Sequence, residues 1–416
     1  MGSMIAAALR AITLGMAVAS VALGGARAAE PIKIGFSMAL TGPYSANGKA
    51  ALVADQMWAE DQNAKGGLLG RPIRLVFYDD QSQTAPVPGI YAKLIDIDKV
   101  DLLISGYGTA AVAAAMPTVM QHGMTFMSLF GLAVNDQFKY DRYFQIAPFG
   151  PGGGGTFSQG FFEVAMTMNP KPMTAAILAT DSEFPQTAAE GARKWAEKFG
   201  LKLVADRKFP PNTVDFSPII RALQAANPDI VYIACFPPET VGIIRAAHEI
   251  GFAPKLIGGG MVGPQYASLK QQLGPLLNGW LTFETYVPAR TTDFSGIHAF
   301  LDRYQPKAAA EGVDPLGYYL PPYSYAGLQI LADAVTATGG LDQAKIAQYI
   351  HATTFHTVAG DVRFAADGEW AVQRLFQAQY QGIKGNDLAQ FKQPETQVIV
   401  YPQGFKSGTL IYPLPH

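Results

Sequence analysis

The sequence Ile73-Arg-Leu-Val-Phe-Tyr-Asp-Asp80 is a short apolar stretch that ends in two carboxylates, a pattern typical of a β-strand followed by a turn. An alanine-rich stretch over residues 50–63 precedes it and predicts a helix, which ends at Gly66-Gly67. A second helix is predicted over residues 87–98. Strand and helix therefore alternate around this stretch, which predicts a parallel sheet with helices on both faces.

The same alternation continues along the chain. Further strands are predicted at residues 32–36, 102–105, 125–129, 174–179, 229–234, 256–258 and 281–287, with short strand-like pieces around 361–364, 375–380 and 398–401. Further helices are predicted at residues 111–122, 184–199, 216–226, 240–250, 294–311, 322–337 and 342–352. The pattern occurs twice, and the glycine-rich sequence Gly150-Pro-Gly-Gly-Gly-Gly155 between the two occurrences is interpreted as a mobile hinge crossover.

We therefore predict an α/β fold with two similar lobes, each a mainly parallel sheet flanked by helices. The expected ranges are 29–149 plus 285–358 for lobe 1 and 150–284 plus 359–416 for lobe 2, with crossings near 148–152, 282–290 and 356–361. Ligands of parallel sheets bind beyond the carboxyl ends of the strands. Two lobes that face each other across such ends form a cleft that can close by a hinge motion.

The first residues of the chain indicate export. Arg10 precedes an apolar run over residues 11–23, and Ala26-Arg27-Ala28 places small residues at the −3 and −1 positions of a cleavage site. The run is shorter than the roughly 20 apolar residues that span a bilayer. We predict a signal peptide over residues 1–28 and release into a bacterial periplasm, without a lipid anchor because no cysteine follows the cleavage site.

Composition excludes several classes of partner. Without residues 1–28 the chain carries 29 basic and 33 acidic side chains, so it has no basic surplus for nucleic acid or anionic lipid. The single cysteine, Cys235, lies in the apolar run 230–236 and is expected to be a buried thiol. We expect a monomer without nucleic-acid partners or membrane anchoring.

Signatures of enzymes are missing from the sequence. Gly35-Phe-Ser-Met-Ala39 lacks the second glycine of a nucleophile elbow, and Gly150–Gly155 is not followed by the Lys-Ser/Thr of a phosphate loop. The histidines never fall at a metal-ligand spacing. The pair Asp79-Asp80 could bind metal or act in acid/base work, but it is expected to cap the following turn and to pair with a nearby cation. We therefore expect a protein that is not an enzyme and needs neither cofactor nor metal.

One strand-to-helix turn is suited to an anionic group. Ser105-Gly-Tyr-Gly-Thr109 precedes the helix predicted from residue 111, and the amides at a helix start are free donors with partial positive charge. Thr109 can add a hydroxyl donor or can cap the helix, and the two roles are compatible.

Several motifs in a fixed order resemble one family. They are Ile32-Lys-Ile-Gly-Phe with Leu40-Thr-Gly-Pro-Tyr-Ser, Asn63-Ala-Lys-Gly-Gly-Leu-Leu-Gly-Arg-Pro-Ile, Tyr78-Asp-Asp-Gln-Ser, Asp215-Phe-Ser-Pro-Ile-Ile, Asn227-Pro-Asp-Ile-Val, Gly251-Phe and Tyr323-Ser-Tyr-Ala. The chain resembles the periplasmic solute-binding proteins of ABC importers, of the branched-chain (hydrophobic) amino-acid type, the Leu/Ile/Val-binding family. The resemblance covers essentially the whole mature chain and implies a type I periplasmic-binding-protein fold.

The resemblance implies roles for particular residues. The family holds its ligand carboxylate with a hydroxyl residue that matches Thr109, beside Gly108, and with backbone groups that match Phe130, Gly131 and Leu132. The family's two partners of the ligand ammonium fall on Leu132 and Gly260, so both are missing and we expect no counter-charge for an amine. A buried, unpaired ammonium costs several kcal/mol, which disfavours an α-amino acid.

The remaining candidate residues are mostly aromatic. Phe184 and Phe236 fall where the family often shows aromatic ligand contacts, and Tyr44, Asn47 and Tyr107 are expected at the rim of the cleft. Such rings favour a ligand with an apolar or aromatic body and one polar head, although rings of this kind can also fill the cores of the lobes.

The sequence therefore predicts a receptor that closes on a small, mostly apolar carboxylate or amide, with an aromatic acid favoured, and delivers it to a membrane ABC permease with its ATPases. One alternative is a true branched-chain amino-acid binder. Another is a sensor module that controls a signalling partner. A secreted α/β hydrolase would need a nucleophile–base pair, and none has a recognisable sequence context.

Overall fold

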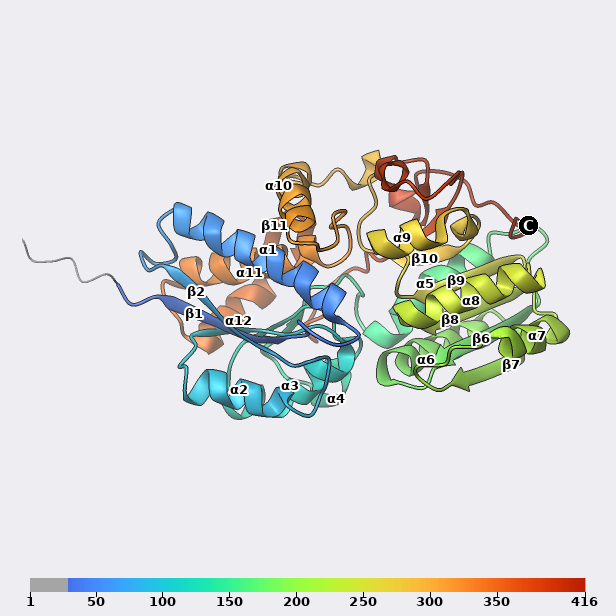
Figure 1. The fold of residues 1–416 in the computed structure, drawn as a ribbon. Coiled ribbons are helices and arrows are strands. Elements are labelled where there is room, and N and C mark those ends of the chain that lie inside the picture. Colours follow the sequence, from blue (N-terminus) through green and yellow to red (C-terminus); the bar gives the residue numbers. More distant parts are fainter. Residues whose placement is uncertain (1–28, 416) are drawn as a thin grey trace, which may run out of the picture.

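The computed structural model describes residues 29–415, and the predicted signal peptide, residues 1–28, lies outside the described residues. Two sheets form two lobes that lie side by side (Figure 1). The first sheet has the order β2-β1-β3-β4-β5, and all its strand pairs are parallel. Its strands are β1 (Ile32–Met38), β2 (Ile73–Asp79), β3 (Leu102–Ile104), β4 (Phe126–Ser128) and β5 (Tyr143–Gln145).

Helices cover both faces of this sheet, as the alternating pattern predicts. One face carries α1 (Ser45–Ala64), α11 (Pro321–Thr338) and α12 (Gln343–Ala352), with α10 (Ile297–Ala310) packed on α1. The opposite face carries α2 (Val87–Asp96), α3 (Thr109–Gln121) and α4 (Val134–Phe138). Three helices of lobe 1, α10 to α12, thus come from a stretch of chain that follows the parallel strands of the second sheet.

The second sheet has the order β14-β13-β10-β9-β8-β6-β7, parallel except where β13 pairs with β10 and β14. Its strands are β6 (Thr174–Thr180), β7 (Lys202–Phe209), β8 (Ile230–Cys235), β9 (Leu256–Met261), β10 (Leu281–Glu284), β13 (Phe376–Tyr380) and β14 (Gln397–Tyr401). The helices of lobe 2 are α5 (Gly153–Ala165), α6 (Glu183–Lys198), α7 (Ser217–Ala226), α8 (Pro237–Ile250) and α9 (Ala267–Leu273). Short 3-10 turns lie at η1 (Gly274–Leu277), η2 (Arg290–Thr292), η3 (Leu388–Lys392) and η4 (Gln403–Phe405).

The two lobes share one topology, because β7-β6-β8-β9-β10 repeats the order of β2-β1-β3-β4-β5. The centre of the second sheet is dry: every residue of β8, from Ile230 to Cys235, has no exposed surface. A central parallel strand covered by helices on both sides requires such a continuous apolar run. The expectation of a buried thiol at Cys235 is confirmed.

The glycine-rich sequence 150–155, interpreted from the sequence as a hinge crossover, is partly helical in the structure. Gly153 to Gly155 form the first turn of α5, so only the start of the run is irregular. A Cβ atom on Gly191 of α6 would lie 2.2 Å from the carbonyl oxygen of Gly154. The missing side chains therefore allow α5 and α6 to pack closely, and sequence analysis did not predict α5 at all.

Three strands were also missed: β5, β7 and the short β11 (Thr354–Thr357). β5 is only three residues long and ends in a buried glutamine, Gln145, which weakens the apolar signal. β7 is an edge strand that carries charged residues, and most of its side chains are exposed or half-buried. A charged edge strand resists pairing with other chains, which explains its polar composition.

The last crossing between the lobes lies later than the sequence suggests. The hairpin of β11 (Thr354–Thr357) and β12 (Gly360–Arg363) continues into residues that contact lobe 1: Gln145 N donates to Gly368 O, and the Phe364 ring lies 5.2 Å from that of Phe144. We therefore propose lobe boundaries with crossings at 146–150, 285–289 and 371–375, which moves the third crossing from 356–361.

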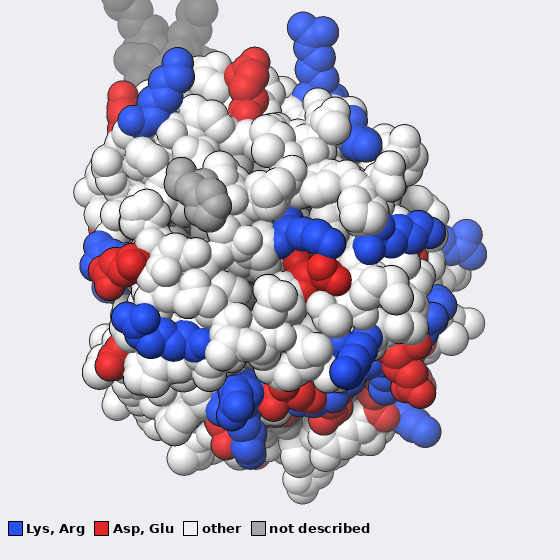
Figure 2. Space-filling model, turned by 90° about the vertical axis from the view of Figure 1, so that its right-hand side faces the viewer, with Lys and Arg blue, Asp and Glu red and all other residues white. Residues whose placement is uncertain are grey.

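The end of lobe 2 is shown face-on in Figure 2, where basic and acidic side chains are interspersed among mostly uncharged ones. This face has no extended basic surface of the kind that binds a nucleic-acid backbone. Among the helices of residues 29–415, none combines the length and the apolar character that a membrane crossing requires.

Candidate functional site

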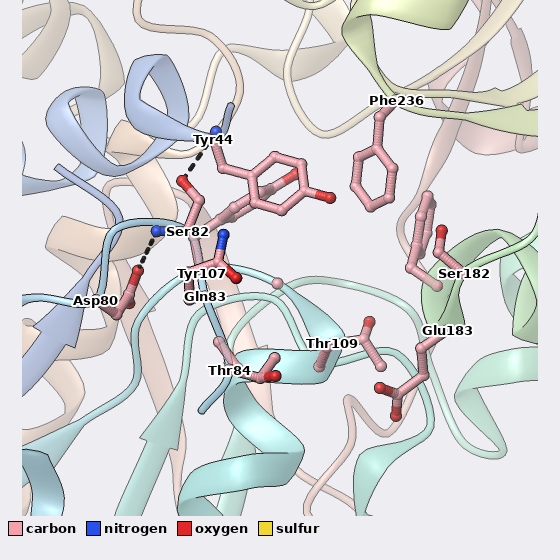
Figure 3. A pocket seen from close by; sticks show the side chains of 14 residues that line it. Tyr44, Asp80, Ser82, Gln83, Thr84, Tyr107, Thr109, Ser182, Glu183 and Phe236 are labelled. Carbon is pink, nitrogen blue, oxygen red and sulfur yellow. Dashed lines mark hydrogen bonds between the residues drawn. The ribbon is translucent and has the colours of Figure 1, made fainter. Parts of the chain in front are cut away.

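A pocket lies between the lobes, at the carboxyl ends of β2 and β3 on one side and of β6 and β8 on the other (Figure 3). It encloses about 490 Å³ of space not filled by protein atoms, part of it open to solvent. Fourteen residues line it: Tyr44, Asp80, Ser82, Gln83, Thr84, Tyr107, Gly108, Thr109, Ala110, Ala111, Ser182, Glu183, Phe184 and Phe236. This position follows the rule that open parallel sheets bind ligands beyond their strand ends.

Aromatic rings join the two lobes across this pocket. The ring centroids of Tyr44 in lobe 1 and Phe236 in lobe 2 are 4.9 Å apart, and Phe236 lies 5.6 Å from Phe184. Tyr107 approaches Tyr44 edge-on at 6.3 Å. The lobes are therefore in contact over the pocket, and the chain is in a closed arrangement with an apolar wall on both sides.

The N-terminus of α3 is the clearest polar feature of the pocket. Gly108 precedes the helix with φ of 101°, a left-handed conformation that favours glycine, and no side chain caps the helix. The first bond of the helix runs from Val112 N to Gly108 O, so the amides of residues 109–111 have no acceptor within the helix. Because the first turn contains no acidic residue, the partial positive charge of this helix end is not neutralised.

Thr109 combines with this helix end. Its side chain is 3% exposed, and its Oγ1 accepts a hydrogen bond from Leu132 N at 3.1 Å. A hydroxyl that accepts one bond can still donate its own hydrogen. Thr109 can therefore present a donor to a ligand while Leu132 N fixes its orientation.

The N-termini of α6 and α8 in lobe 2 differ in charge from the N-terminus of α3. Glu183 lies in the first turn of α6, and Glu239, 4% exposed, lies in the first turn of α8. A carboxylate in the first turn of a helix offsets its dipole. The N-termini of α3, α6 and α8 all lie at this pocket. The N-terminus of α3 is therefore better suited to bind an anion than that of α6 or α8.

Two carboxyl groups line the pocket, which corrects the expectation that it offers no counter-charge to an amine. Asp80 is 1% exposed; its Oδ1 accepts from Ser82 N at 2.9 Å, and its Oδ2 has no partner within residues 29–415. Burial raises the pKa of Asp80, and the neighbouring Asp79 adds to the rise. Desolvation also raises the pKa of Glu183, which is exposed at the pocket mouth. Both groups were missed because the family's ammonium partners fall on positions 132 and 260, and because Asp80 was expected only to cap a turn.

Asp79 caps the turn after β2, as predicted, and also stabilises the turn after β1, but no ion pair of Asp79 or Asp80 with a cation occurs within residues 29–415. Its Oδ1 accepts from the backbone N–H groups of Leu40, Thr41 and Gln81, and its Oδ2 accepts from the Thr41 hydroxyl at 2.6 Å. These bonds hold the backbone that leads to Tyr44. The pair therefore divides its roles, because Asp79 fixes a turn while Asp80 lines the pocket.

Six of the eleven residues singled out from the sequence line the pocket: Tyr44, Tyr107, Gly108, Thr109, Phe184 and Phe236. Asn47 is buried one turn into α1 and does not line it. Gly260 lies within β9, where a Cβ atom would be 2.5 Å from the hydroxyl of Tyr232. An acidic side chain at this position would collide with Tyr232, so position 260 belongs to the interior of lobe 2.

The turn over residues 130–132 lies behind the pocket and not in its lining. The Phe130 ring packs 5.7 Å from Tyr107 and 4.8 Å from Phe149. The carbonyl of Gly131 accepts from the Tyr143 hydroxyl and from Gln145 Nε2, and Leu132 N is bonded to Thr109. In this closed arrangement these backbone groups support Thr109 and the aromatic rings that pack behind the pocket.

The polar residues that sequence reasoning missed share one signal. Ser82, Gln83 and Thr84 follow β2, and Ser182 follows β6, so they lie at the carboxyl ends of neighbouring strands. The rule on strand ends could have identified them, but sequence analysis applied it only to the turn before Thr109. Ser182 Oγ is buried and has no partner within residues 29–415.

Comparison with known proteins agrees with the fold and the pocket. The model of the periplasmic binding protein family matches residues 31–386. The Leu/Ile/Val-binding protein homolog 7 of Brucella abortus is 24% identical over 351 residues, which cover 82% of this chain and 85% of the relative. An amino acid binding protein of Pseudomonas aeruginosa is 25% identical over 371 residues, which cover 86% and 92% of the two chains.

Solved structures show the same architecture. The branched-chain amino acid transporter substrate-binding protein LivJ of Streptococcus pneumoniae, in complex with isoleucine, superposes with a TM-score of 0.72 and 20% identity and covers 90% of this chain and 100% of its own. A solute-binding protein of R. palustris in complex with benzoate superposes with a TM-score of 0.71 and 19% identity, covering 89% and 95%. Both likenesses support the type I periplasmic-binding-protein fold.

The fold and the pocket are thus those of a two-lobed periplasmic binding protein. The chain belongs to the periplasmic binding protein family. Within residues 29–415, no group of three histidine, cysteine or acidic side chains is placed to hold a metal ion.

Proposed function

We propose that this chain is the extracytoplasmic solute-binding component of an ABC importer of the branched-chain amino-acid type, and that it binds a small, mostly apolar carboxylate, with an aromatic acid favoured. The observation that carries the proposal is the N-terminus of α3, which brings free amides and the Thr109 hydroxyl into a pocket walled by aromatic rings. A carboxylate suits such a helix end, and a ring suits the walls.

The shape of the pocket supports one polar head and one apolar body. Tyr44 and Tyr107 lie on one side of the space and Phe236 on the other, with Thr109 below them (Figure 3). The Phe184 ring, 5.6 Å from that of Phe236, belongs to the same side as Phe236. No basic side chain lines the pocket within the described part of the chain, so the head must be neutralised by amides and a hydroxyl. A binding site of this kind suits a single carboxylate or a neutral amide better than a strongly charged anion.

A true branched-chain amino-acid binder is the second candidate, and one observation favours it. Asp80 and Glu183 place two carboxyl groups on the pocket, and either could pair with the ammonium of an amino acid bound by its carboxylate at α3. The solved relative that contains isoleucine and the one that contains benzoate represent these two candidates.

Capture and delivery follow from closure of the lobes. A solute that contacts both lobes stabilises the closed form, because the open form cannot make both sets of contacts. The closed form, after export through the predicted signal peptide, would be what a membrane permease with its ATPases recognises. The protein itself would form no covalent bond.

Calorimetry on the mature protein tests the proposal, with benzoate, phenylacetate, leucine, isoleucine and valine as probes. We expect benzoate or phenylacetate to bind at least about tenfold more tightly than the amino acids, a free-energy difference of about 1.4 kcal/mol. Tight binding of leucine with no binding of either aromatic acid would reject the aromatic assignment and favour the second candidate. Binding of none of the five would reject both.

A further inference from the structure

Arg374, which lies in the third crossing, contacts the first crossing through its backbone and a residue just beyond the second crossing through its side chain. Its backbone N–H donates to the carbonyl of Pro148 in the first crossing at 3.1 Å. Its guanidinium donates from Nη2 to Ala359 O and from Nη1 to Asp361 O, the latter at 3.4 Å. Both carbonyls belong to the β11–β12 hairpin region, which contacts lobe 1.

Two aromatic rings enclose the same guanidinium. Its carbon lies 4.4 Å from the ring centroid of Phe294, which follows the second crossing, and 4.6 Å from that of Trp370, which precedes the third. The Trp370 indole donates to Ile146 O at 2.8 Å, next to the first crossing. Arg374 and its neighbours thus contact all three crossings.

These contacts surround the buried guanidinium of Arg374. The residue is 9% exposed and forms no ion pair with a carboxylate within residues 29–415. Arginine stays charged in proteins, so the cation is stabilised here only by ring faces and backbone carbonyls. Any rotation of one crossing away from Arg374 would remove part of that stabilisation, so the crossings are held in a fixed relation to one another.

The surrounding backbone is shaped to admit the side chain. Gly360 has φ of 83°, and a Cβ atom there would lie 2.7 Å from Nη1 of Arg374 and 2.9 Å from the Phe294 ring. The Tyr323 hydroxyl, close to this cluster, donates to Thr285 O of the second crossing at 2.8 Å. The cluster lies outside the ligand pocket, because none of its members is in the pocket lining.

We propose that Arg374 is a positioning residue for closure. Its contacts, called the clasp below, hold the three crossings so that the lobes approach in the one orientation that brings Tyr44 against Phe236. The proposal rests on the proposed function only in requiring that the lobes open and close. Loss of the clasp broadens the range of lobe orientations and lowers the fraction of molecules that can close correctly on a ligand. The apparent Kd rises in proportion, about tenfold when that fraction falls to one-tenth.

The test measures the distance between the lobes in the ligand-free protein. Spin labels are attached through Lys65→Cys in lobe 1 and Glu190→Cys in lobe 2, both at exposed positions, while the native Cys235 is fully buried. Electron-electron double resonance then compares the labelled wild type with Arg374→Lys, which keeps the charge but loses the planar group that stacks between the rings. We expect a broader distance distribution and a benzoate Kd raised about tenfold.

Three controls separate closure from stability and from ligand contact. Arg363→Lys, at an exposed arginine of the same hairpin, should change neither measurement. Thr109→Ala should raise the benzoate Kd without altering the ligand-free distances. A purely structural role of Arg374 would lower the thermal unfolding midpoint and leave the distance distribution as it is.

An unchanged distance distribution in folded Arg374→Lys would overturn the proposal. If that variant does not fold, Phe294→Leu removes one ring of the clasp and leaves the hydrogen bonds, and an unchanged distribution there has the same consequence. Failure of the wild type to bind benzoate would reject the aromatic-acid assignment alone, because the ligand-free distances do not depend on it.

Discussion

The two walls of the pocket are built on the same topology but differ in charge. In lobe 1, α3 begins without an acidic residue or a capping side chain, and its free amides face the pocket beside Thr109. In lobe 2, α6 and α8 begin with Glu183 and Glu239 in their first turns, and the wall between them consists of the Phe184 and Phe236 rings. This difference supports the proposal that the polar head of the ligand binds at α3 of lobe 1 and that the rings of lobe 2 contact its apolar body.

The largest effect is expected when an acidic residue, such as those in the first turns of α6 and α8, is introduced in the first turn of α3. Ala111→Asp places a carboxylate in the first turn of α3, where it neutralises the helix end and repels an anionic ligand. We expect the benzoate Kd to rise about 100-fold or more, since like charges in contact cost several kcal/mol. Calorimetry measures it, and Ala111→Asn, equal in size but neutral, is the matched control. Equal affinities of the Asp and Asn variants would show that the head does not bind at α3.

Removing the hydroxyl of lobe 1 should have the next largest effect. Thr109→Ala leaves the charged head of the ligand with one donor fewer, at a cost of about 1–3 kcal/mol. The dissociation constant, measured in the same way, should recover largely in Thr109→Ser, which keeps the hydroxyl. A Kd equal to that of the wild type in Thr109→Ala would contradict the role of this residue.

Removing a ring from the lobe 2 wall of the pocket should reduce ligand affinity less than the two preceding changes. This loss of affinity should not depend on the charge of the ligand's polar head. Phe236→Ala removes the ring that meets Tyr44 and is expected to weaken aromatic ligands by about 1–2 kcal/mol. Benzoate and benzamide should lose affinity by the same factor if the ring contacts only the body. Phe199→Ala, in the Trp195–Phe199 pair on α6 and away from the pocket lining, is the control.

The smallest effect is expected at the mouth of the pocket. Glu183 is exposed and its pKa is raised by desolvation, so it is neutral below that pKa and negatively charged above it. Benzoate affinity should therefore fall slightly as pH rises through the titration of Glu183, by less than about 1 kcal/mol for an exposed charge. Glu183→Gln should reduce this dependence in calorimetry between pH 5 and 8, and the titration of Asp80, whose pKa is also raised, accounts for what remains. If the ligand is instead an amino acid whose ammonium pairs with Glu183, the same substitution should weaken leucine binding.

Much of the fold could be predicted from the sequence because the signal is local. The strands around residues 73–80 and 230–235 are apolar runs between helical stretches, and both occur where the sequence places them. The predictions failed where the local signal is weak: β5 is short, β7 carries charges along an edge, and the start of α5 consists of glycines. Glycine is a poor helix former, so no propensity argument predicts a helix there.

The candidate site was predictable in part for the same reason. Residues in turns that directly follow a strand, such as Thr109 and Phe236, line the pocket because every parallel strand ends at the same edge of its sheet. Of the residues assigned by matching positions to a family, Thr109, Phe184 and Phe236 line the pocket, whereas Gly260 and Leu132 do not. A match of positions does not specify which neighbouring side chain, here Tyr232 or Thr109, already occupies the space.

The sequence by itself determined the alternation of strands and helices, the two-lobed class of fold and the turn that favours an anion, because these depend on neighbours along the chain. Only the tertiary structure decided that Asp80 and Glu183 share one pocket, that Tyr44 meets Phe236, and that Arg374 joins the three crossings. These contacts link residues that are far apart in the sequence, and they exist only once both sheets have formed and the lobes have closed on each other.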